Sequence, residues 1–482
     1  MNKTVNKSNE KTITLILYFG IILIWLFFTL TSSLSFEYLC SITTILLAAQ
    51  LALIIFYRKK VIDPSMIIFI VFVLFQFGLP ILKGIDHKFY NYYLTEFSND
   101  LLIRCTKISY TCILAYGLAM ILFKGNDNVV IKESQNGLFK EQNKNVINAF
   151  AVSLLFVTGI VSFGLGLVNM ILARKYGYEF IKTDPFNLTN PITNFCTELF
   201  VPAIFLCLYF SKSSKQNIIV IIISILYSGV LVFTGARTTS MALLACILFY
   251  FYDKNKNDKK TKWIFLFGTL VIVACVVWVA QFRHSHEISS FSIFDIFKSL
   301  INEMGFNFTS ICFTEKFVPF ETNYLYGMSY INSFLCLIPK SLDPTGFITN
   351  INNGLPEIWL DKQLHVYYSG KYDFGVGYSV IAEAYLNFGP LAFLPVFIQS
   401  CIINWLFNKK SGQYSVKINK YIKLILLFTL FTYPRRSFIT LLKSIEYDLL
   451  LIFVLIRVYN NICKYFHKNS RYDYYEVMIN EK

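Results

Sequence analysis

The sequence predicts an all-α polytopic membrane protein with about 12 transmembrane helices and one large extracytoplasmic loop. Three observations predict this fold class. Hydrophobic residues make up 55% of the 482 residues, charged residues only 15%, and the mean hydropathy is +0.53. Apolar runs recur from end to end, many near the roughly 20 residues that a membrane-spanning helix needs. Basic residues gather in alternate connecting segments, as the positive-inside rule requires.

The apolar runs place the expected helices in chain order. The first follows Lys3, Lys7 and Lys11 and lacks a small-residue cleavage site, so we interpret it as an uncleaved helix rather than a signal peptide. The expected spans lie at 13–32, 38–57, 64–82, 101–123, 146–171, 193–210, 217–234, 238–252, 263–281, 378–407, 421–433 and 445–460.

The charge pattern predicts the orientation. With the N-terminus in the cytoplasm, the dense lysine clusters all fall on the cytoplasmic side. These clusters lie in segments 58–60, 124–145, 212–215, 253–262, 408–420 and the C-terminal tail. The prediction therefore divides the chain into helices 1–9 (1–282), an extracytoplasmic loop (283–377), helices 10–12 (378–460) and a cytoplasmic basic tail (461–482).

Two features of the second half stand out. The loop at 283–377 is rich in Tyr, Phe, Trp and Leu, so we expect it to fold over a site at the outer face of a membrane. Directly after it, the sequence Asn387-Phe388-Gly389-Pro390 interrupts an apolar run. We expect a bend there, because proline removes a backbone donor and clashes one turn back.

Composition also excludes some functions. The net charge of +15 does not indicate a nucleic-acid partner, because the basic residues follow the membrane topology. The 11 cysteines are scattered, mostly inside apolar runs, and no Cys/His cluster predicts a metal site. Cys312 and Cys336 share the large loop, with no spacing rule that supports a disulfide between them.

Arginines at the outer ends of expected spans are the main candidate site. Arg237, Arg283, Arg435 and Arg436 each follow such an end, where the positive-inside bias should deplete them. An arginine near membrane depth is costly unless it is paired or reaches water. Their convergence would suit an anionic ligand, since guanidinium binds phosphate oxygens bidentately. The alternative is that they snorkel to lipid phosphates.

The sequence offers two kinds of candidate for proton transfer, histidines beside Arg283 and an acid within an apolar span. His284 and His286 follow Arg283, and Glu383 lies inside an apolar span, where an unpaired carboxylate is expensive. Glu198 is a similar but weaker case. His-x-His alone is a weak metal signal.

The outer loops are also rich in aromatic residues. Tyr378, Trp359 and His365 are candidates for contact with a glycan, through stacking on sugar rings and hydrogen bonds to hydroxyls. Aromatic side chains at this level also form an interface belt in membrane proteins, and composition does not separate the two interpretations.

Four short motifs carry a resemblance to a known family. They are TGAR (234–237) followed by Arg283 after the next span, YGMSYINSFLCLIP (326–339), GVGYSVIAEAYLNFGPLAF (375–393) and PRRSF (434–438). Over about residues 230–440 the chain resembles the Wzy-type O-antigen and capsular polysaccharide repeat-unit polymerases.

The resemblance implies a glycosyltransferase of GT-C-like architecture at the outer face of the cytoplasmic (inner) membrane. Such an enzyme joins repeat units carried on undecaprenyl diphosphate and needs no cofactor, nucleotide sugar or metal. A flippase and a chain-length regulator would be its pathway partners. The residues also leave open a lipid-linked oligosaccharide flippase, an O-antigen ligase, or a proton-coupled transporter that uses Glu198 and Glu383.

Overall fold

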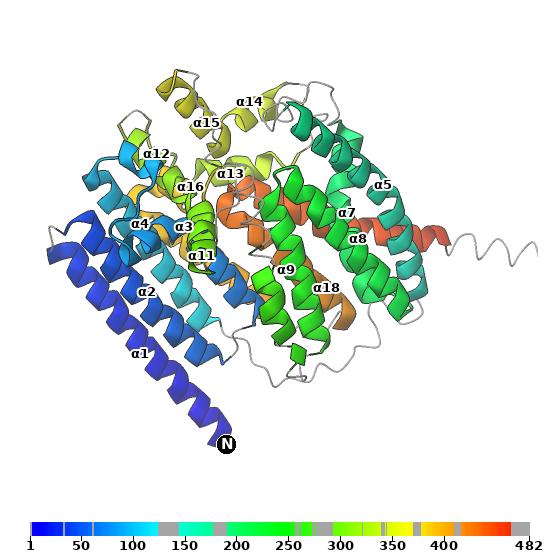
Figure 1. Ribbon diagram of the computed structural model, residues 1–482, viewed down its shortest axis with the longest axis horizontal. Helices are drawn as coiled ribbons and strands as arrows, with labels where there is room; N and C mark the ends of the chain where they lie inside the picture. The colour runs from blue at the N-terminus through cyan, green and yellow to red at the C-terminus, as the bar shows by residue number, and fades with distance from the viewer. Residues whose placement is uncertain are drawn as a thin grey trace, which may run out of the picture. The chain divides into compact units, whose positions relative to one another are not determined.

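The computed structural model describes residues 2–31, 34–59, 62–123, 144–176, 190–255, 260–261, 263–271, 274, 293–320, 322–338, 343, 345–369, 377–408 and 416–463. Within these residues every regular element is a helix (Figure 1). The elements are α1 (Asn2–Thr31), α2 (Phe36–Arg58), α3 (Pro64–Ile85), η1 (Tyr92–Glu96), α4 (Asn99–Leu122), α5 (Lys144–Tyr176), α7 (Pro191–Phe210), α8 (Ser214–Phe233), α9 (Arg237–Lys254), α11 (Ile293–Gly305), α12 (Phe308–Phe317), α13 (Met328–Leu335), α14 (Phe347–Asn353), α15 (Pro356–Tyr367), α16 (Val380–Phe388), η4 (Gly389–Ala392), α17 (Phe393–Asn408), α18 (Val416–Thr432), η5 (Tyr433–Arg435), α19 (Phe438–Ile445) and η6 (Glu446–Leu451).

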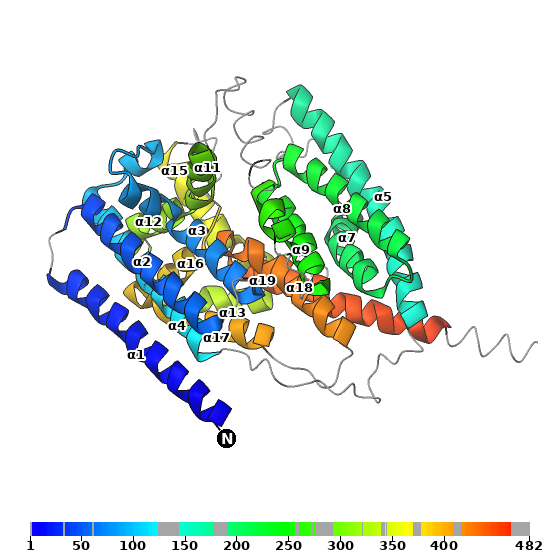
Figure 2. The ribbon, with the colours of Figure 1, turned by 60° about the horizontal axis from the view of Figure 1, so that its bottom comes forward.

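The chain forms two compact units that cut across its sequence order. Unit 1 comprises Met1–Val129, Ser289–Lys409 and Leu430–Leu442, and unit 2 comprises Val130–Ile288, Lys410–Thr429 and Lys443–Lys482. Unit 1 thus combines the first four helices with the described part of the large loop. In both Figure 1 and Figure 2, α1, α2 and α4 of unit 1 run side by side.

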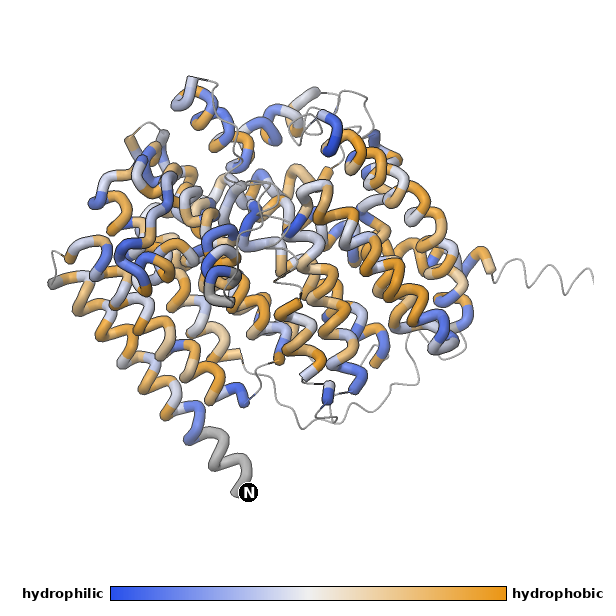
Figure 3. The backbone as a smooth tube through the Cα atoms, viewed as in Figure 1, coloured by the Kyte–Doolittle hydropathy of each residue, from blue (hydrophilic) through white to orange (hydrophobic). Residues whose placement is uncertain are grey.

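Eight helices of the described part are long and apolar enough to cross a membrane. They are Asn9–Leu30, Phe36–Arg58, Pro64–Ile85, Asn99–Leu122, Asn145–Tyr176, Pro191–Phe210, Ser214–Phe233 and Val380–Asn408. They coincide with expected spans one to seven and ten, and Figure 3 shows their largely apolar course. The polytopic all-helical class is confirmed. The other four expected spans stay predictions.

One end of unit 1 gathers the segments expected on the cytoplasmic side. Side chains from the start of α1, the end of α2 and the end of α17 reach the last turn of α4 or one another. The contacts are Lys59 with Glu10 at 2.5 Å, Lys11 Nζ with the Leu122 carbonyl at 3.3 Å, Arg58 with Asp63 at 2.7 Å, and Asn408 with the Phe123 carbonyl. Alternating spans require this grouping.

The opposite end of unit 1 gathers the segments expected outside. Asn91 donates to Asn302 at 3.0 Å, and Lys298 lies 3.2 Å from Asp86. The hydrogen bond from Lys298 is the largest cause of a lowered pKa at Asp86. Tyr368 donates to Glu96, again joining the connection before α4 to the large loop. The loop and the α3–α4 connection therefore share one end of this unit.

In unit 2, the lysine-rich segments that are expected on the cytoplasmic side also lie together at one end. Gln216 Nε2 donates to Asn148 Oδ1 at 2.8 Å, and Tyr250 Oη donates to the Leu208 carbonyl at 3.0 Å. Lys420 pairs with Asp253 at 2.7 Å. The start of α5, the α7–α8 connection, the end of α9 and the start of α18 therefore meet at one end, as the charge pattern predicts.

Helix α11, the first helix of the large loop, comes into backbone contact with α3 in unit 1. A Cβ added to Gly78 in α3 would lie 2.7 Å from the Cα of Gly305 in α11. A Cβ on Gly305 would lie 2.5 Å from the Leu79 nitrogen. Only glycine allows the two helices to touch at this point, so α11 packs directly on a membrane-spanning helix.

The bend expected at Asn387–Pro390 is confirmed. Helix α16 ends at Phe388, a 3-10 turn occupies Gly389–Ala392, and α17 continues from Phe393. Gly389 has φ +56°, and a Cβ there would lie 2.8 Å from the Tyr324 ring. Proline and a left-handed glycine together end α16 and redirect the chain.

The Gly78–Gly305 approach yields a stability prediction. Gly305→Ala should destabilise the protein by about 1–3 kcal/mol or more, because the new methyl group meets rigid backbone rather than a movable side chain. Thermal unfolding of the purified protein in detergent measures the effect. Gly164→Ala in α5 is the matched control, because its Cβ would meet no described atom within 4 Å. Equal melting temperatures for Gly305→Ala and wild type would contradict the packing argument.

Candidate functional site: a clamped arginine loop

Residues 433–437, here called the arginine loop, connect α18 to α19 in unit 1. The 3-10 turn Tyr433–Arg435 begins the loop, and the Arg436 amide donates to the Tyr433 carbonyl at 2.9 Å. Arg435 and Arg436 are both exposed, whereas Tyr433, Pro434 and Ser437 are buried. The loop therefore presents two guanidinium groups from a backbone that is packed into the protein.

Three amide side chains fix the first half of the loop. The Pro434 carbonyl accepts hydrogen bonds from Gln76 in α3 and from Asn307 Nδ2, the latter at 3.3 Å. Tyr433 Oη donates to Gln399 Oε1 in α17 at 2.8 Å. These partners come from three separate parts of unit 1, so the loop has little freedom to shift.

Two carboxylates hold the second half. The Ser437 amide and hydroxyl both donate to Glu357 Oε1 of α15, at 2.8 and 2.9 Å. The next amide, that of Phe438, donates to Glu383 Oε2 of α16 at 2.7 Å. Successive backbone amides at the start of α19 are thus capped by acids from two different helices.

Glu383 belongs to a continuous hydrogen-bond network. Its residue is only 1% exposed, and its Oε1 accepts from the Ser329 hydroxyl at 2.8 Å. Asn387 Nδ2 donates to the same hydroxyl at 2.7 Å, while its Oδ1 accepts from the Gly327 amide at 3.0 Å. Because Ser329 accepts from Asn387, its own proton is directed to Glu383. Both oxygens of the buried carboxylate therefore receive a donor.

The side chain of Arg435 packs against the backbone of Gly377. A Cβ added to Gly377 would lie 3.2 Å from Arg435 Nε, 3.3 Å from its Cγ and 3.4 Å from Asn307 Oδ1. The stem of the arginine therefore lies against the bare backbone of a glycine whose φ is +66°. A larger residue at this position would displace the guanidinium as well as strain the backbone.

Arg237 is held separately, within unit 2. Helix α8 ends at Phe233, Gly235 has φ +87°, and α9 begins at Arg237 itself. The hydroxyls of Ser228 and Ser240 lie 2.5 Å apart and tie the two helices together just behind the turn. The expected tight turn is therefore present. A cation at a helix N-terminus opposes the helix dipole, so helix stability does not explain Arg237.

The other candidates differ in where they lie. Arg283, His284 and His286 fall outside the described residues. Tyr378 is fully buried, which favours a packing role over glycan contact, whereas His365 is exposed on α15. Trp359 is partly buried, and its indole nitrogen has no hydrogen-bond acceptor within the described part.

The hydrogen bonds from the Ser437 and Phe438 amides to Glu357 and Glu383 are here called the clamp. Sequence reasoning missed the residues that support this clamp. Ser329 and Asn387 carry no charge, and nothing in the sequence around them indicates a hydrogen bond to a distant carboxylate. The one available signal is spacing, since Asn387 lies four residues after Glu383 and therefore on the same face of α16. Two other acids escaped notice: Glu315, paired with Arg104 at 2.5 Å, and the buried Asp448, which accepts from Thr429 at 3.3 Å.

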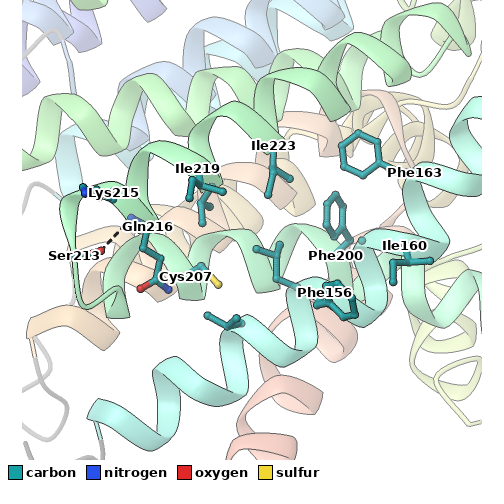
Figure 4. A pocket seen from close by; sticks show the side chains of 14 residues that line it. Phe156, Ile160, Phe163, Phe200, Cys207, Ser213, Lys215, Gln216, Ile219 and Ile223 are labelled. Carbon is teal, nitrogen blue, oxygen red and sulfur yellow. Dashed lines mark hydrogen bonds between the residues drawn. The ribbon is translucent and has the colours of Figure 1, made fainter.

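Unit 2 contains an apolar groove of about 730 Å³ between α5, α7 and α8 (Figure 4). Phe156, Ile160, Phe163 and Phe200 line one end, and Lys215 lies at the opposite end. No histidine or carboxylate is among its lining residues, so the groove offers contacts for hydrocarbon chains rather than groups for acid–base chemistry. Within the described residues, no three His, Cys, Asp or Glu side chains gather as a metal site would require.

The fold and the clamped loop define a multi-pass membrane protein that presents two exposed arginines from a loop fixed among the helices of unit 1. Comparison with protein-family models matches residues 11–468 to the family described as O-antigen polysaccharide polymerase Wzy. The chain belongs to this family, which confirms the resemblance seen in its motifs and supports a role in O-antigen polymerisation. No curated protein and no solved structure matches the chain.

The network around Glu383 predicts a specific energetic cost. Ser329→Ala removes the donor to Glu383 Oε1 and the acceptor of Asn387 Nδ2, so we expect a loss of about 1–3 kcal/mol in the free energy of unfolding. Thermal or detergent unfolding of purified protein provides the measurement. Ser333→Ala is the control, because its hydroxyl bonds only to the Ser329 carbonyl of its own helix. A Ser329→Ala variant no less stable than the control would refute the network's contribution.

Proposed function

We propose that this protein polymerises oligosaccharide repeat units carried on undecaprenyl diphosphate at the outer face of the cytoplasmic membrane. The growing glycan leaves its lipid diphosphate and is transferred to a sugar hydroxyl of the next lipid-linked unit. The observation that supports this most directly is the arginine loop, whose two exposed guanidinium groups stand on a backbone held by Gln76, Asn307, Glu357 and Glu383.

The proposed reaction places negative charge on the departing group. The acceptor oxygen forms a bond to the anomeric carbon while the bond from that carbon to the diphosphate oxygen breaks. The diphosphate keeps the electron pair, and Arg435 and Arg436 stabilise the charge that develops on it. Arginine suits this role because it stays protonated and presents a fork of donors to phosphate oxygens.

The remaining steps need a proton acceptor and the exclusion of water. His284, His286 and Glu383 are the candidates for accepting the hydroxyl proton. Helices α12 to α15 of the large loop would cover the donor and keep water from hydrolysing it. Arg237 and Arg283 are proposed as further diphosphate contacts, each to be tested by its own substitution.

Substitution of the loop arginines tests the proposal. Arg435→Ala and Arg436→Ala should each lower the polymerisation rate by on the order of 100-fold, because charge stabilisation in the transition state is lost. Lysine at either position should retain part of the rate as a point charge. The assay uses purified protein with a defined lipid-diphosphate repeat unit, with chain lengths read on a gel. Arg237→Ala and Arg283→Ala are examined in the same way.

Arg457→Ala is the matched control, since Arg457 is exposed but belongs to unit 2, whereas this loop belongs to unit 1. In cells, loss of a polymerase caps the surface lipid with one repeat unit. Loss of a ligase instead leaves polymer on the carrier, and loss of a flippase leaves neither at the surface. Full-length chains from both the Arg435→Ala and Arg436→Ala variants would exclude the diphosphate assignment.

A further inference from the structure

Two acids from different helices converge on the point where the arginine loop joins α19. Glu357 Oε1 accepts from the amide and the hydroxyl of Ser437, and Glu383 Oε2 accepts from the amide of Phe438. Thr440 of the first turn of α19 also lies within 3.4 Å of Glu357 Oε1. Two of the amides that could bind an anion at this helix N-terminus, those of Ser437 and Phe438, are therefore already occupied by carboxylates.

We infer that Glu357 and Glu383 are positioning residues that fix the loop from which Arg435 and Arg436 reach the leaving diphosphate. The inference rests on the proposed function. Because the glutamates satisfy the helix N-terminus, an anion arriving from outside finds the guanidinium groups and not the backbone as its partners. The acids thereby direct the diphosphate to the two arginine side chains.

The surroundings of Glu383 favour positioning over proton transfer. The residue is 1% exposed, and its two oxygens accept from Ser329 and from the Phe438 amide. A general base must come within hydrogen-bond reach of the hydroxyl it deprotonates, and substrate would first have to displace these donors. Asn387 reinforces the arrangement, because its donation to Ser329 leaves the serine proton for Glu383.

Gln and Asp substitutions separate the two roles. Glu383→Gln keeps the length of the side chain and an oxygen for the Phe438 amide, so a positioning role predicts a rate within about tenfold of wild type. Glu383→Asp withdraws the carboxylate by about 1.5 Å and cannot span both donors. We expect it to lower the rate by roughly 100-fold, as a displaced arginine pair would. The same order, Gln above Asp, is expected at Glu357.

The opposite order would overturn the inference for Glu383. A general base retains activity as aspartate, which still carries a carboxylate, and loses it as glutamine. Asp361→Asn, an exposed acid on α15 beside Glu357, controls for the loss of a charge at this face. Melting temperatures of all variants, measured alongside, separate a displaced loop from a protein that fails to fold.

A second readout follows the loop without relying on activity. Arg436→Cys introduces an exposed thiol, whereas most of the native cysteines are buried. Its labelling rate with a charged maleimide should change several-fold when Glu383→Asp or Glu357→Asp is added, and should stay unchanged with either Gln variant. Unchanged labelling in the Asp variants would overturn the clamp. Altered labelling of the Asp variants, combined with full-length chains from both the Arg435→Ala and Arg436→Ala variants, would uphold the clamp and refute the proposed function.

Discussion

The end of unit 1 that contains the arginine loop depends on one interaction, the acceptance of two hydrogen bonds by the buried carboxylate of Glu383. An acid inside an apolar helix is expensive unless its oxygens are satisfied. Here the donors are the Ser329 hydroxyl and the Phe438 amide, which belong to α13 and to the start of α19. Three helices must therefore keep their register for this one side chain to remain stable.

Helix α16 ends just beyond Glu383, and the carbonyls at its end take part in further hydrogen bonds. The Leu325 and Tyr326 amides donate to the carbonyls of Leu386 and Asn387, at 3.0 Å each, so the segment before α13 uses the carbonyls at the end of α16. Pro390 has no amide hydrogen to donate to the Leu386 carbonyl one turn back, so this acceptor is left for the Leu325 amide. The 3-10 turn at Gly389–Ala392 thus frees the acceptors that bind the loop to the membrane-spanning part.

Local patterns in the sequence predicted eight of the spans, the bend and the tight turn before Arg237. Each of these depends on residues close together in the chain, namely an apolar run, a proline or a glycine. The clamp does not, because Glu357 lies 80 residues from Ser437 and Ser329 lies 54 residues from Glu383. Hydropathy places such polar residues near a membrane boundary but does not identify their partners, and it also gave no sign that Tyr378 would be buried.

The rigidity of the clamp also helps to distinguish a transferase from a transporter or flippase. A transporter or flippase must loosen its grip on the cargo as the cargo crosses, so its binding groups need alternative positions. In unit 1 the arginine loop is instead tied to α3, α15, α16 and α17 through separate hydrogen bonds. Charge stabilisation of a leaving group gains from this rigidity, because donors that are already in place need no reorganisation as the bond breaks. The geometry of the loop therefore supports a transferase more than a carrier.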